Sequence, residues 1–239
     1  MRYLVGTSGF SYDHWEGVFY PLGMRKNKWL SYYADFFPTV ELNVTFYRLP
    51  KRESFKRWFK DVPKDFVFAA KGSRYITHIK RLKDVADSIR IFRDQLSGLG
   101  KKLEVILWQF PPQMKIDLDR FHRFVRELRK VRKRHAFEFR HESWFTDEIY
   151  KILSDHNYAL CIADSPGWSS PEVVTADWLY IRFHGGQELY ASEYSQRELK
   201  EWSRKITRWG KEGYIYFNND YRGFAVKNGL YLLDLLSSL

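Results

Sequence analysis

The stretch His135-Ala-Phe-Glu-Phe-Arg-His-Glu-Ser-Trp144 decides the fold prediction, because its side chains alternate as they do along a β-strand. The alternation places Phe137 and Phe139 on one face, and Glu138 and Arg140 on the other. A strand that directs its aromatics outward and a Glu and an Arg inward needs a polar interior to receive them. Such an interior is typical of the mouth of a barrel or of a cleft, and not of a sandwich core.

Short apolar or alternating runs predict seven further strands. In order along the chain, the eight predicted strands are Tyr3–Thr7, Thr39–Thr45, Asp65–Lys71, Leu103–Phe110, the opening stretch, Tyr158–Ala163, Asp177–His184 and Tyr214–Phe217. Helical spacing of apolar residues predicts helices at residues 28–37, 53–59, 88–99, 117–128, 149–153, 195–209 and 228–238. Strands that alternate with helices favour one α/β domain over residues 1–239, an irregular TIM-type (β/α)8 barrel of parallel strands, and an open doubly wound sheet is the alternative.

Polar side chains lie near the carboxyl end of nearly every predicted strand. In a barrel these strand ends share one rim, which is where the active sites of TIM barrels lie. The sequence therefore predicts a site at this rim. Its candidate residues are Glu41, Asn43, Lys71, Gln109, Glu138, Arg140, Asp164, Arg182, His184, Asn218 and Asp220.

Composition limits the compartment and the partners. The formal net charge is +11, which could attract nucleic acid or another phosphate-bearing partner, or could reflect a charge-rich surface. Cys161 is the single cysteine, so an intramolecular disulfide is excluded and a reducing compartment is indicated. The first residues lack the apolar core of a signal peptide, and no run approaches the roughly 20 apolar residues of a membrane span. We expect a cytoplasmic protein without a membrane segment or an obligate protein partner.

Several segments together resemble the signature blocks of the domain of unknown function 72 family, also called YecE-like. They are Gly6-Thr-Ser-Gly-Phe-Ser-Tyr12, Val40-Glu-Leu-Asn-Val-Thr-Phe-Tyr47, Ile76-Thr-His78, Gln109-Phe-Pro-Pro112, Phe137-Glu-Phe-Arg-His-Glu-Ser-Trp144, Tyr180-Ile-Arg-Phe-His-Gly185 and Tyr216-Phe-Asn-Asn219. The resemblance implies a TIM barrel similar to the endonuclease IV and xylose isomerase class. The reaction of the family is not established, and a nuclease or DNA-binding role rests on structural likeness.

The first functional hypothesis is phosphodiester chemistry on nucleic acid or another phosphate ester, with hydrolase activity. Arg140, Arg182 and Lys71 would bind phosphate oxygens. Glu138 or Asp164 would serve as a base or metal ligand, and His184 as an acid or ligand. The remaining substrate-binding candidates are Asn43, His78, Gln109, Trp144, Asn218 and Asp220, and loop aromatics that could stack a base are Trp15, Tyr47, Trp144 and Trp168.

A metal-assisted version of this chemistry needs several converging ligands. Endonuclease IV-like enzymes use a richer His set than this chain offers, since only His184 is predicted to point inward from a strand. A trinuclear zinc site is therefore not expected, and one Mg²⁺ or Mn²⁺ ion held by carboxylates stays open.

Two alternatives stay open. Glu41 and Glu138 would suit a glycoside-type hydrolase if their carboxyl groups stood about 5 to 5.5 Å or 6.5 to 9.5 Å apart. A barrel that binds a metabolite or DNA without catalysis is the other alternative. Glu138 could also be a buried ion-pair partner of Arg140 or Arg182. Strand parity places Cys161 opposite Asp164, in the core.

Overall fold

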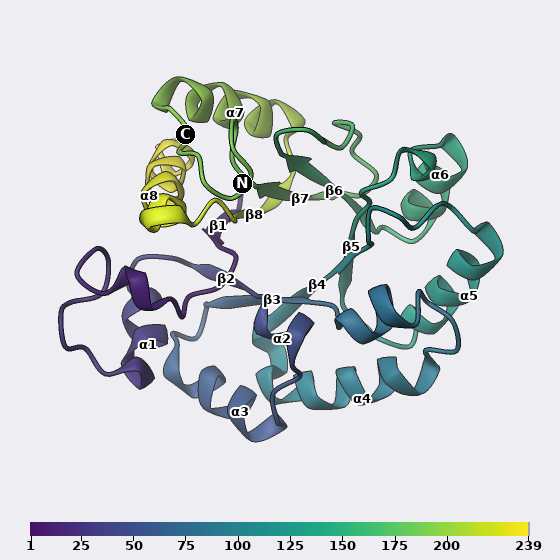
Figure 1. The fold of residues 1–239 in the computed structure, drawn as a ribbon, viewed down its shortest axis with the longest axis horizontal. Coiled ribbons are helices and arrows are strands. Elements are labelled where there is room, and N and C mark those ends of the chain that lie inside the picture. The colour runs from purple at the N-terminus through teal and green to yellow at the C-terminus, as the bar shows by residue number, and fades with distance from the viewer. Residues whose placement is uncertain (239) are drawn as a thin grey trace.

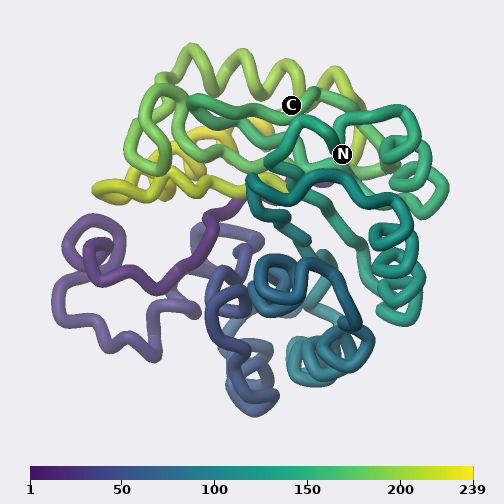
Figure 2. The backbone as a smooth tube through the Cα atoms, turned by 45° about the vertical axis from the view of Figure 1, so that its right-hand side comes forward, coloured from purple at the N-terminus to yellow at the C-terminus, as the bar shows by residue number. Residues whose placement is uncertain are grey.

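Eight parallel strands form one sheet that curls into a nearly closed barrel, with helices around its outside (Figures 1 and 2). The computed structural model describes residues 1–238. The strands are β1 (Tyr3–Thr7), β2 (Thr39–Leu42), β3 (Val67–Lys71), β4 (Leu103–Gln109), β5 (Arg134–Glu138), β6 (Ala159–Asp164), β7 (Trp178–Phe183) and β8 (Glu212–Phe217). Chain neighbours pair from β2 to β8, and β8 pairs with β1. This confirms the predicted TIM-type α/β barrel.

Helices connect the consecutive strands except β6 and β7, which are joined by a loop, and the last helix follows β8. The helices are α1 (Trp29–Tyr33), α2 (Val44–Tyr47), α3 (Arg52–Asp61), α4 (Ala86–Leu96), α5 (Leu118–Leu128), α6 (Asp147–Asp155), α7 (Gln196–Trp209) and α8 (Phe224–Ser237). Shorter helical turns lie at Asp13–Trp15, Lys26–Lys28, Tyr75–Ile79, Ser97–Lys102, Glu142–Trp144 and Tyr221–Gly223. The segment predicted as a strand over residues 39–45 is shorter, because α2 begins at Val44, and Asn43 therefore lies beyond the end of β2.

Local sequence signals explain where two of the long helices begin. Asp117 caps α5, because its side chain accepts a hydrogen bond from Arg120 N at 2.9 Å. Ser195 and Glu198 form a capping box at the start of α7. In both helices the apolar residues recur on one face, and that face packs against the outside of the barrel.

The barrel closes between β1 and β2 through one tyrosine of α1. The hydroxyl of Tyr33 accepts a hydrogen bond from Thr7 N at 2.9 Å and donates one to Thr39 O at 3.0 Å. The two strands approach so closely that a Cβ on Gly6 would lie 2.1 Å from Thr39 O. Only glycine fits there. One bridge between Ser8 and Glu41 completes the seam, and it places Glu41 beside the carboxyl end of β1.

The aromatic residues fill two separate layers of the core. Most pack between the sheet and the helices, where Phe137 and Phe139 lie fully buried as their outward direction predicts. Inside the barrel, Tyr180, Tyr214 and Tyr216 pack in one cluster with small residues of other strands, which are Ala69, Ala136, Ala159, Cys161 and Ala163. The interior is thus apolar and aromatic in its middle, and charged only toward the strand ends.

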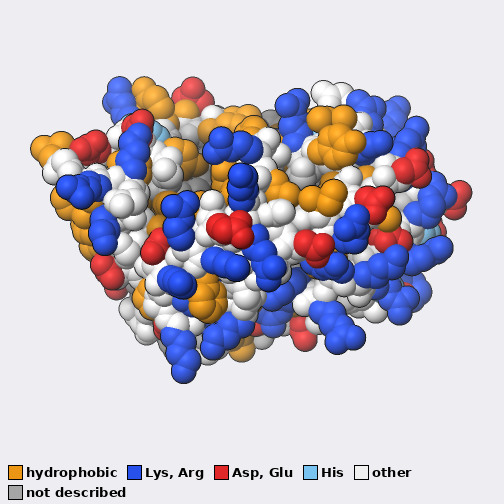
Figure 3. All heavy atoms as spheres, turned by 90° about the horizontal axis from the view of Figure 1, so that it is seen from below, with side chains coloured by type: hydrophobic (Ala, Val, Ile, Leu, Met, Phe, Trp, Pro, Cys, Tyr) orange, Lys and Arg blue, Asp and Glu red, His pale blue; other side chains and the backbone are white. Residues whose placement is uncertain are grey.

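Surface charge is spread over the molecule. Figure 3, which shows the molecule from below, has Lys and Arg in excess over Asp and Glu and intermixed with them. This distribution agrees with a solvated charged surface on that face. No helix among residues 1–238 has the length and apolar character needed to cross a membrane.

Candidate functional site

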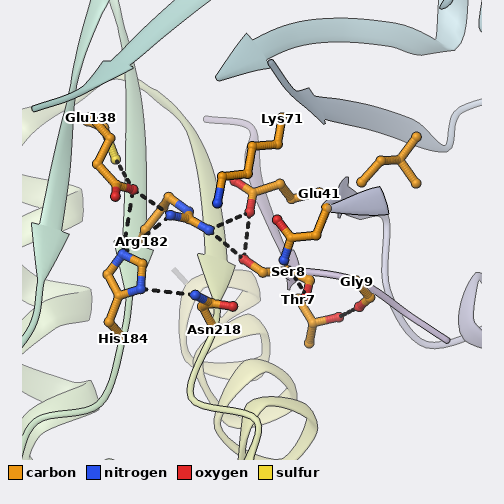
Figure 4. Close-up of polar contacts among 12 residues, drawn as sticks. Thr7, Ser8, Gly9, Glu41, Lys71, Glu138, Arg182, His184 and Asn218 are labelled. Carbon is orange, nitrogen blue, oxygen red and sulfur yellow. Dashed lines mark hydrogen bonds and ion pairs between the residues drawn. The ribbon is translucent and has the colours of Figure 1, made fainter. Parts of the chain in front are cut away.

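A fully buried arginine joins two carboxylates near the carboxyl end of the barrel (Figure 4). Arg182 of β7 donates through Nη1 to Glu138 Oε2 at 2.5 Å and through Nη2 to Glu41 Oε1 at 2.8 Å. All three side chains have no exposed surface. Glu41 also accepts hydrogen bonds from the hydroxyls of Ser8 at 2.7 Å and Tyr180 at 2.6 Å. Both of its oxygens are therefore occupied.

The second carboxylate, Glu138, is held by three further groups. Arg140 Nε donates to Glu138 Oε1 at 2.8 Å, and His184 Nε2 lies 3.5 Å from Oε2. Burial alone would raise the pKa of Glu138, but Arg182, Arg140 and His184 together hold it well below its usual value. Glu138 is thus an anion whose charge is compensated within the protein.

His184 is neutral at physiological pH. Burial, with Arg182 nearby, lowers its pKa to about 4. Asn218 Nδ2 lies 3.1 Å from His184 Nδ1 and donates to it, which places the ring proton on Nε2, toward Glu138. His184 therefore orients Glu138 from below the pocket and does not line it.

Lys71, the last residue of β3, stands beside this network without joining it. Its side chain is buried. Within residues 1–238 its ammonium group makes no hydrogen bond, and every carboxylate is more than 4.0 Å away. Its close contact is the ring of Phe46, whose centroid is 4.3 Å from Nζ. Burial and the charge of Arg182 lower the pKa of Lys71 to about 7, although Glu138 and Glu41 oppose the shift.

A cavity of about 730 Å³ opens above the network, between the loops that follow the strands. Its charged lining residues are mostly cationic: Lys71, Arg74 and Arg140 against Asp220. The polar and aromatic part of the lining comprises Tyr12, His14, Asn43, Phe46, Tyr47, His78, Gln109, Tyr190, Asn218 and Tyr221. Asn43 donates through Nδ2 to Ser8 O at 3.0 Å, which fixes its side chain at the wall of the cavity.

The acidic lining residue, Asp220, belongs to a small cluster after β8. Trp15 Nε1 donates to Asp220 Oδ1 at 2.7 Å, and His14 Nε2 lies 2.9 Å from Oδ2. Burial raises the pKa of Asp220 to about 6, although Trp15 and His14 oppose the shift. Asp220 can therefore exchange a proton near neutral pH.

Exposed aromatics surround the mouth of the cavity. Tyr47 is 76% exposed and Tyr221 is 53% exposed. Tyr190 adopts a left-handed backbone conformation (φ 63°), and its hydroxyl lies 3.4 Å from Arg140 Nη2. Trp168 covers the other side of Arg140, with its ring centroid 4.5 Å from the guanidinium carbon. Arg140 is thus fixed at the wall of the cavity by Glu138, Tyr190 and Trp168.

Two predicted site residues lie elsewhere. Asp164 points outward, against Tyr194 and Trp202, because β6 directs Ala163 and Cys161 into the barrel. The predicted inward orientation of Asp164 is therefore wrong, and Cys161 is a buried residue of the inner wall, 3.9 Å from Glu138 Oε2.

Trp144, predicted to contact the ligand, belongs to the core. It is fully buried, stacks on Phe139 at 4.8 Å and donates through Nε1 to Met114 O at 2.7 Å. Trp15 is buried as well, and it reaches the cavity only through its hydrogen bond to Asp220.

The other predicted residues do converge. Asn43, Lys71, His78, Gln109, Arg140, Asn218 and Asp220 line the cavity, and Glu41, Glu138, Arg182 and His184 form the network below it. Sequence reasoning missed Tyr12, His14, Arg74, Tyr190 and Tyr221, which come from loops without a periodic pattern. The block Gly6–Tyr12 was the one signal that pointed to any of them.

The residues present do not fit a divalent metal ion. Among residues 1–238, no three His, Cys, Asp or Glu side chains come together as a metal-binding group. The oxygens of Glu41 and Glu138 already accept hydrogen bonds from arginine, serine or tyrosine. The hypothesis of one Mg²⁺ or Mn²⁺ ion held by these carboxylates therefore receives no support from the geometry.

Comparisons with known proteins point to one family. The family described as "Protein of unknown function DUF72" matches residues 4–239. The UPF0759 protein YunF of Bacillus subtilis (strain 168) is 27% identical, over 97% of this chain and 94% of that protein. A crystal structure of a DUF72 family protein from Thermotoga maritima is 33% identical with a TM-score of 0.88, covering 99% of this chain and all of that one. A second crystal structure of a DUF72 family protein, from Enterococcus faecalis, shows the same fold with a TM-score of 0.80. It is 24% identical and covers 98% of this chain and 95% of that one.

Proposed function

This chain belongs to the DUF72 family, and we propose from the geometry of its own site that it binds a phosphate ester in the cavity at the carboxyl end of the barrel. The phosphate would lie against Lys71, Arg74 and Arg140, which line one continuous cavity. Ammonium and guanidinium groups are the side chains that proteins use most for phosphate.

The observation that carries the proposal is the charge balance around the cavity. Arg182 and Arg140 are matched by the two carboxylates, Glu41 and Glu138. Lys71 and Arg74 then have no ion-pair partner within residues 1–238. An anion is the ligand that would compensate them, and a cavity with low-dielectric walls strengthens that attraction.

The uncharged lining suits the rest of such a ligand. The side chain of Gln109 offers both a hydrogen-bond donor and an acceptor to a hydroxyl or amine of the ligand. The exposed rings of Tyr47 and Tyr221 at the mouth can stack a planar group such as a nucleobase. A nucleotide, free or at the end of a nucleic acid, combines these three features.

Hydrolysis of the bound ester is the further step of this proposal, and Asp220 with His14 is its acid–base pair. Among the carboxylates, Asp220 lines the cavity with a pKa of about 6, whereas Glu41, Glu138 and His184 lie buried beneath it. A glycoside-type reaction that uses Glu41 and Glu138 has less support, because both are sequestered by Arg182.

Titration calorimetry with adenosine 5′-monophosphate and with adenosine tests the binding proposal, since the two ligands differ only in the phosphate. We expect the phosphate to tighten binding, and Arg74→Ala to weaken the nucleotide roughly 10- to 100-fold by removing a charge-assisted contact. Arg126→Ala on the exposed face of α5 is the matched control and should change nothing. Equal affinity for the two ligands, or an unchanged affinity in Arg74→Ala, would refute the proposal.

A single-stranded oligonucleotide with a 5′-phosphate decides between a free nucleotide and a nucleic acid. Tighter binding of the oligonucleotide with a steep loss of affinity in salt would favour nucleic acid, because neutralised phosphates release counterions. Equal affinity with weak salt dependence would favour the small ester.

A further inference from the structure

Lys71 is a buried amine without a structural partner. It lies at the carboxyl end of β3 with its Nζ toward the cavity, and the nearby carboxylates, Glu41 and Glu138, are both bound to Arg182. Figure 4 shows the lysine side chain reaching down beside Glu41 and the guanidinium of Arg182. A buried ammonium is normally paired or hydrogen-bonded, so its isolation calls for a role other than holding the fold.

Lys102 shows what a structural lysine looks like in the same molecule. It is as buried as Lys71, but its Nζ donates to Phe59 O at 2.6 Å and to Val62 O at 2.7 Å. It ties the end of α3 to the turn before β4. Lys71 has the equivalent ring contact, with Phe46 in place of Phe59, and lacks both carbonyl acceptors.

The surroundings of Lys71 favour the free amine over the ammonium ion. Arg182 and Arg140 act against a positive charge at Nζ, burial does so more strongly, and Glu138 and Glu41 offset this in part. With a pKa of about 7, about half of Lys71 is unprotonated at pH 7, some three orders of magnitude more than for an ordinary lysine. A desolvated amine of this kind is the form in which lysine acts as a nucleophile.

We propose that Lys71 forms an imine with a carbonyl compound that carries a phosphate group, such as a phosphorylated aldehyde or ketone. The proposal rests on the proposed function for the binding of the phosphate, which would lie against Arg74 and Arg140 while the carbonyl carbon meets Nζ. In the reaction, the lone pair of Nζ forms a bond to the carbonyl carbon and the π pair moves to oxygen. The two protons of the amine leave with that oxygen as water, so no oxidant or reductant is consumed.

The cavity also supplies a group that can move protons during this step. His78 shares the ring of Phe46 with Lys71, at 5.0 Å between the two ring centroids, and both residues line the cavity. Burial and the neighbouring Lys71 lower the pKa of His78 to about 4, so the ring is neutral. Thr77 Oγ1 lies 2.8 Å from His78 Nδ1, which leaves Nε2 free to accept a proton from the attacking amine.

Pyridoxal 5′-phosphate is a suitable probe, because it combines an aldehyde with a phosphate. The whole chain is incubated with a substoichiometric amount at pH 7, reduced with borohydride and mapped by mass spectrometry. We expect Lys71 to carry on the order of ten times more adduct than any other lysine, given its excess of free amine. Pyridoxine 5′-phosphate, which lacks the aldehyde, should protect Lys71. Lys71→Arg should abolish that adduct, and Lys151→Arg, a change at an exposed lysine, should leave it intact.

The comparison of three probes separates this inference from the proposed function. If pyridoxine 5′-phosphate binds but the adduct falls only on exposed lysines, phosphate binding stands and imine formation at Lys71 is refuted. Pyridoxal, which lacks the phosphate, could label Lys71 to the same extent as pyridoxal 5′-phosphate while pyridoxine 5′-phosphate does not bind. This result would refute phosphate recognition and leave the nucleophilic lysine standing. Preferential, phosphate-dependent labelling of Lys71 supports both.

Discussion

Replacing Lys71 by methionine should stabilise the protein at neutral and acidic pH. Methionine keeps the length and apolar body of the side chain and removes the ammonium group, which has no partner within residues 1–238. The unfolded chain carries this lysine with its ordinary pKa of 10.5, whereas the folded protein lowers that pKa to about 7. The folded state therefore binds fewer protons between these two values, and the stability of the wild type rises with pH across that range.

The size of the effect follows from the shift. A difference between 10.5 and about 7 corresponds to about 5 kcal/mol of destabilisation at pH 6, which disappears as the pH approaches 10.5. Loss of the contact with the ring of Phe46 costs about 1 kcal/mol in the opposite direction. We expect Lys71→Met to gain about 4 kcal/mol of unfolding free energy at pH 6 and close to nothing at pH 10.

Urea denaturation of both proteins at pH 6, 7, 8.5 and 10 measures this difference. Lys102→Met is the matched control with the opposite sign, because it strands the carbonyl groups of Phe59 and Val62 and should lose about 1–3 kcal/mol. A loss of stability in Lys71→Met at pH 6, or a gain that does not shrink as pH rises, would refute the view that Lys71 is an uncompensated buried cation. It would remove the basis for a reactive amine as well.

Three further predictions concern the seam, the network and the cavity. Tyr33→Phe should lose about 2–4 kcal/mol in urea denaturation, because Thr39 O and the facing amide of β1 lose their shared partner. Glu138→Gln should lose about 3–5 kcal/mol at pH 7, since it removes the carboxylate that pairs with Arg182 and Arg140. The loss should shrink as pH falls below 4.5, because the unfolded wild-type chain then binds a proton at Glu138, whereas the folded protein holds the pKa of this carboxyl well below that value. Asp220→Asn should raise the affinity for adenosine 5′-monophosphate relative to wild type roughly fivefold as pH rises through 6, measured by titration calorimetry, because the wild type gains a negative charge in the cavity there.

Each of these has a clear contrary outcome. A Tyr33→Phe protein of wild-type stability would mean that water replaces the hydroxyl at the seam. A stable Glu138→Gln protein would show that Glu138 is free for chemistry and is not a structural anion. A constant affinity ratio for Asp220→Asn between pH 5 and 8 would place Asp220 away from the bound phosphate.

The fold could be predicted because each strand carries its own signal. Alternation in the opening stretch placed Glu138 inside and Phe137 outside, and both directions hold. Where a strand is apolar on both faces, this signal vanishes. In β6 the run Cys161-Ile-Ala163 offers no polar residue to mark the inner face, so Asp164 at the strand end does not reveal which way it points. Residue size held the missing information, because Cys161 and Ala163 are small enough to lie on the inner face beside the bulky Tyr180 of the neighbouring strand.

The site could be predicted as a set of residues, but not as a pattern of charges. All of these residues lie at the carboxyl ends of strands, and the sequence therefore predicts that Arg182, Glu138 and Glu41 lie close together. It does not predict which cation pairs with which carboxylate, because that depends on the direction of each side chain. Arg182 is central and planar, so its two terminal nitrogens bind the carboxylates of two different strands at once. Lys71 offers a single point charge from β3 and is left out.

This exclusion leaves the amine of Lys71 unpaired beside the cavity. If Lys71 formed an ion pair with Glu41, and Arg182 paired with Glu138 alone, the pKa of Lys71 would be raised. The lysine would then be an ammonium ion without a free lone pair. In the arrangement observed, the carboxylates hold the arginines in place, and burial together with the charge of Arg182 lowers the pKa of Lys71 to about 7. Substituting Arg182 should therefore change the reactivity of Lys71 without touching it, by freeing Glu41 to pair with the ammonium group. The buried ion pairs act as the support that keeps one amine unpaired at the floor of a cationic pocket.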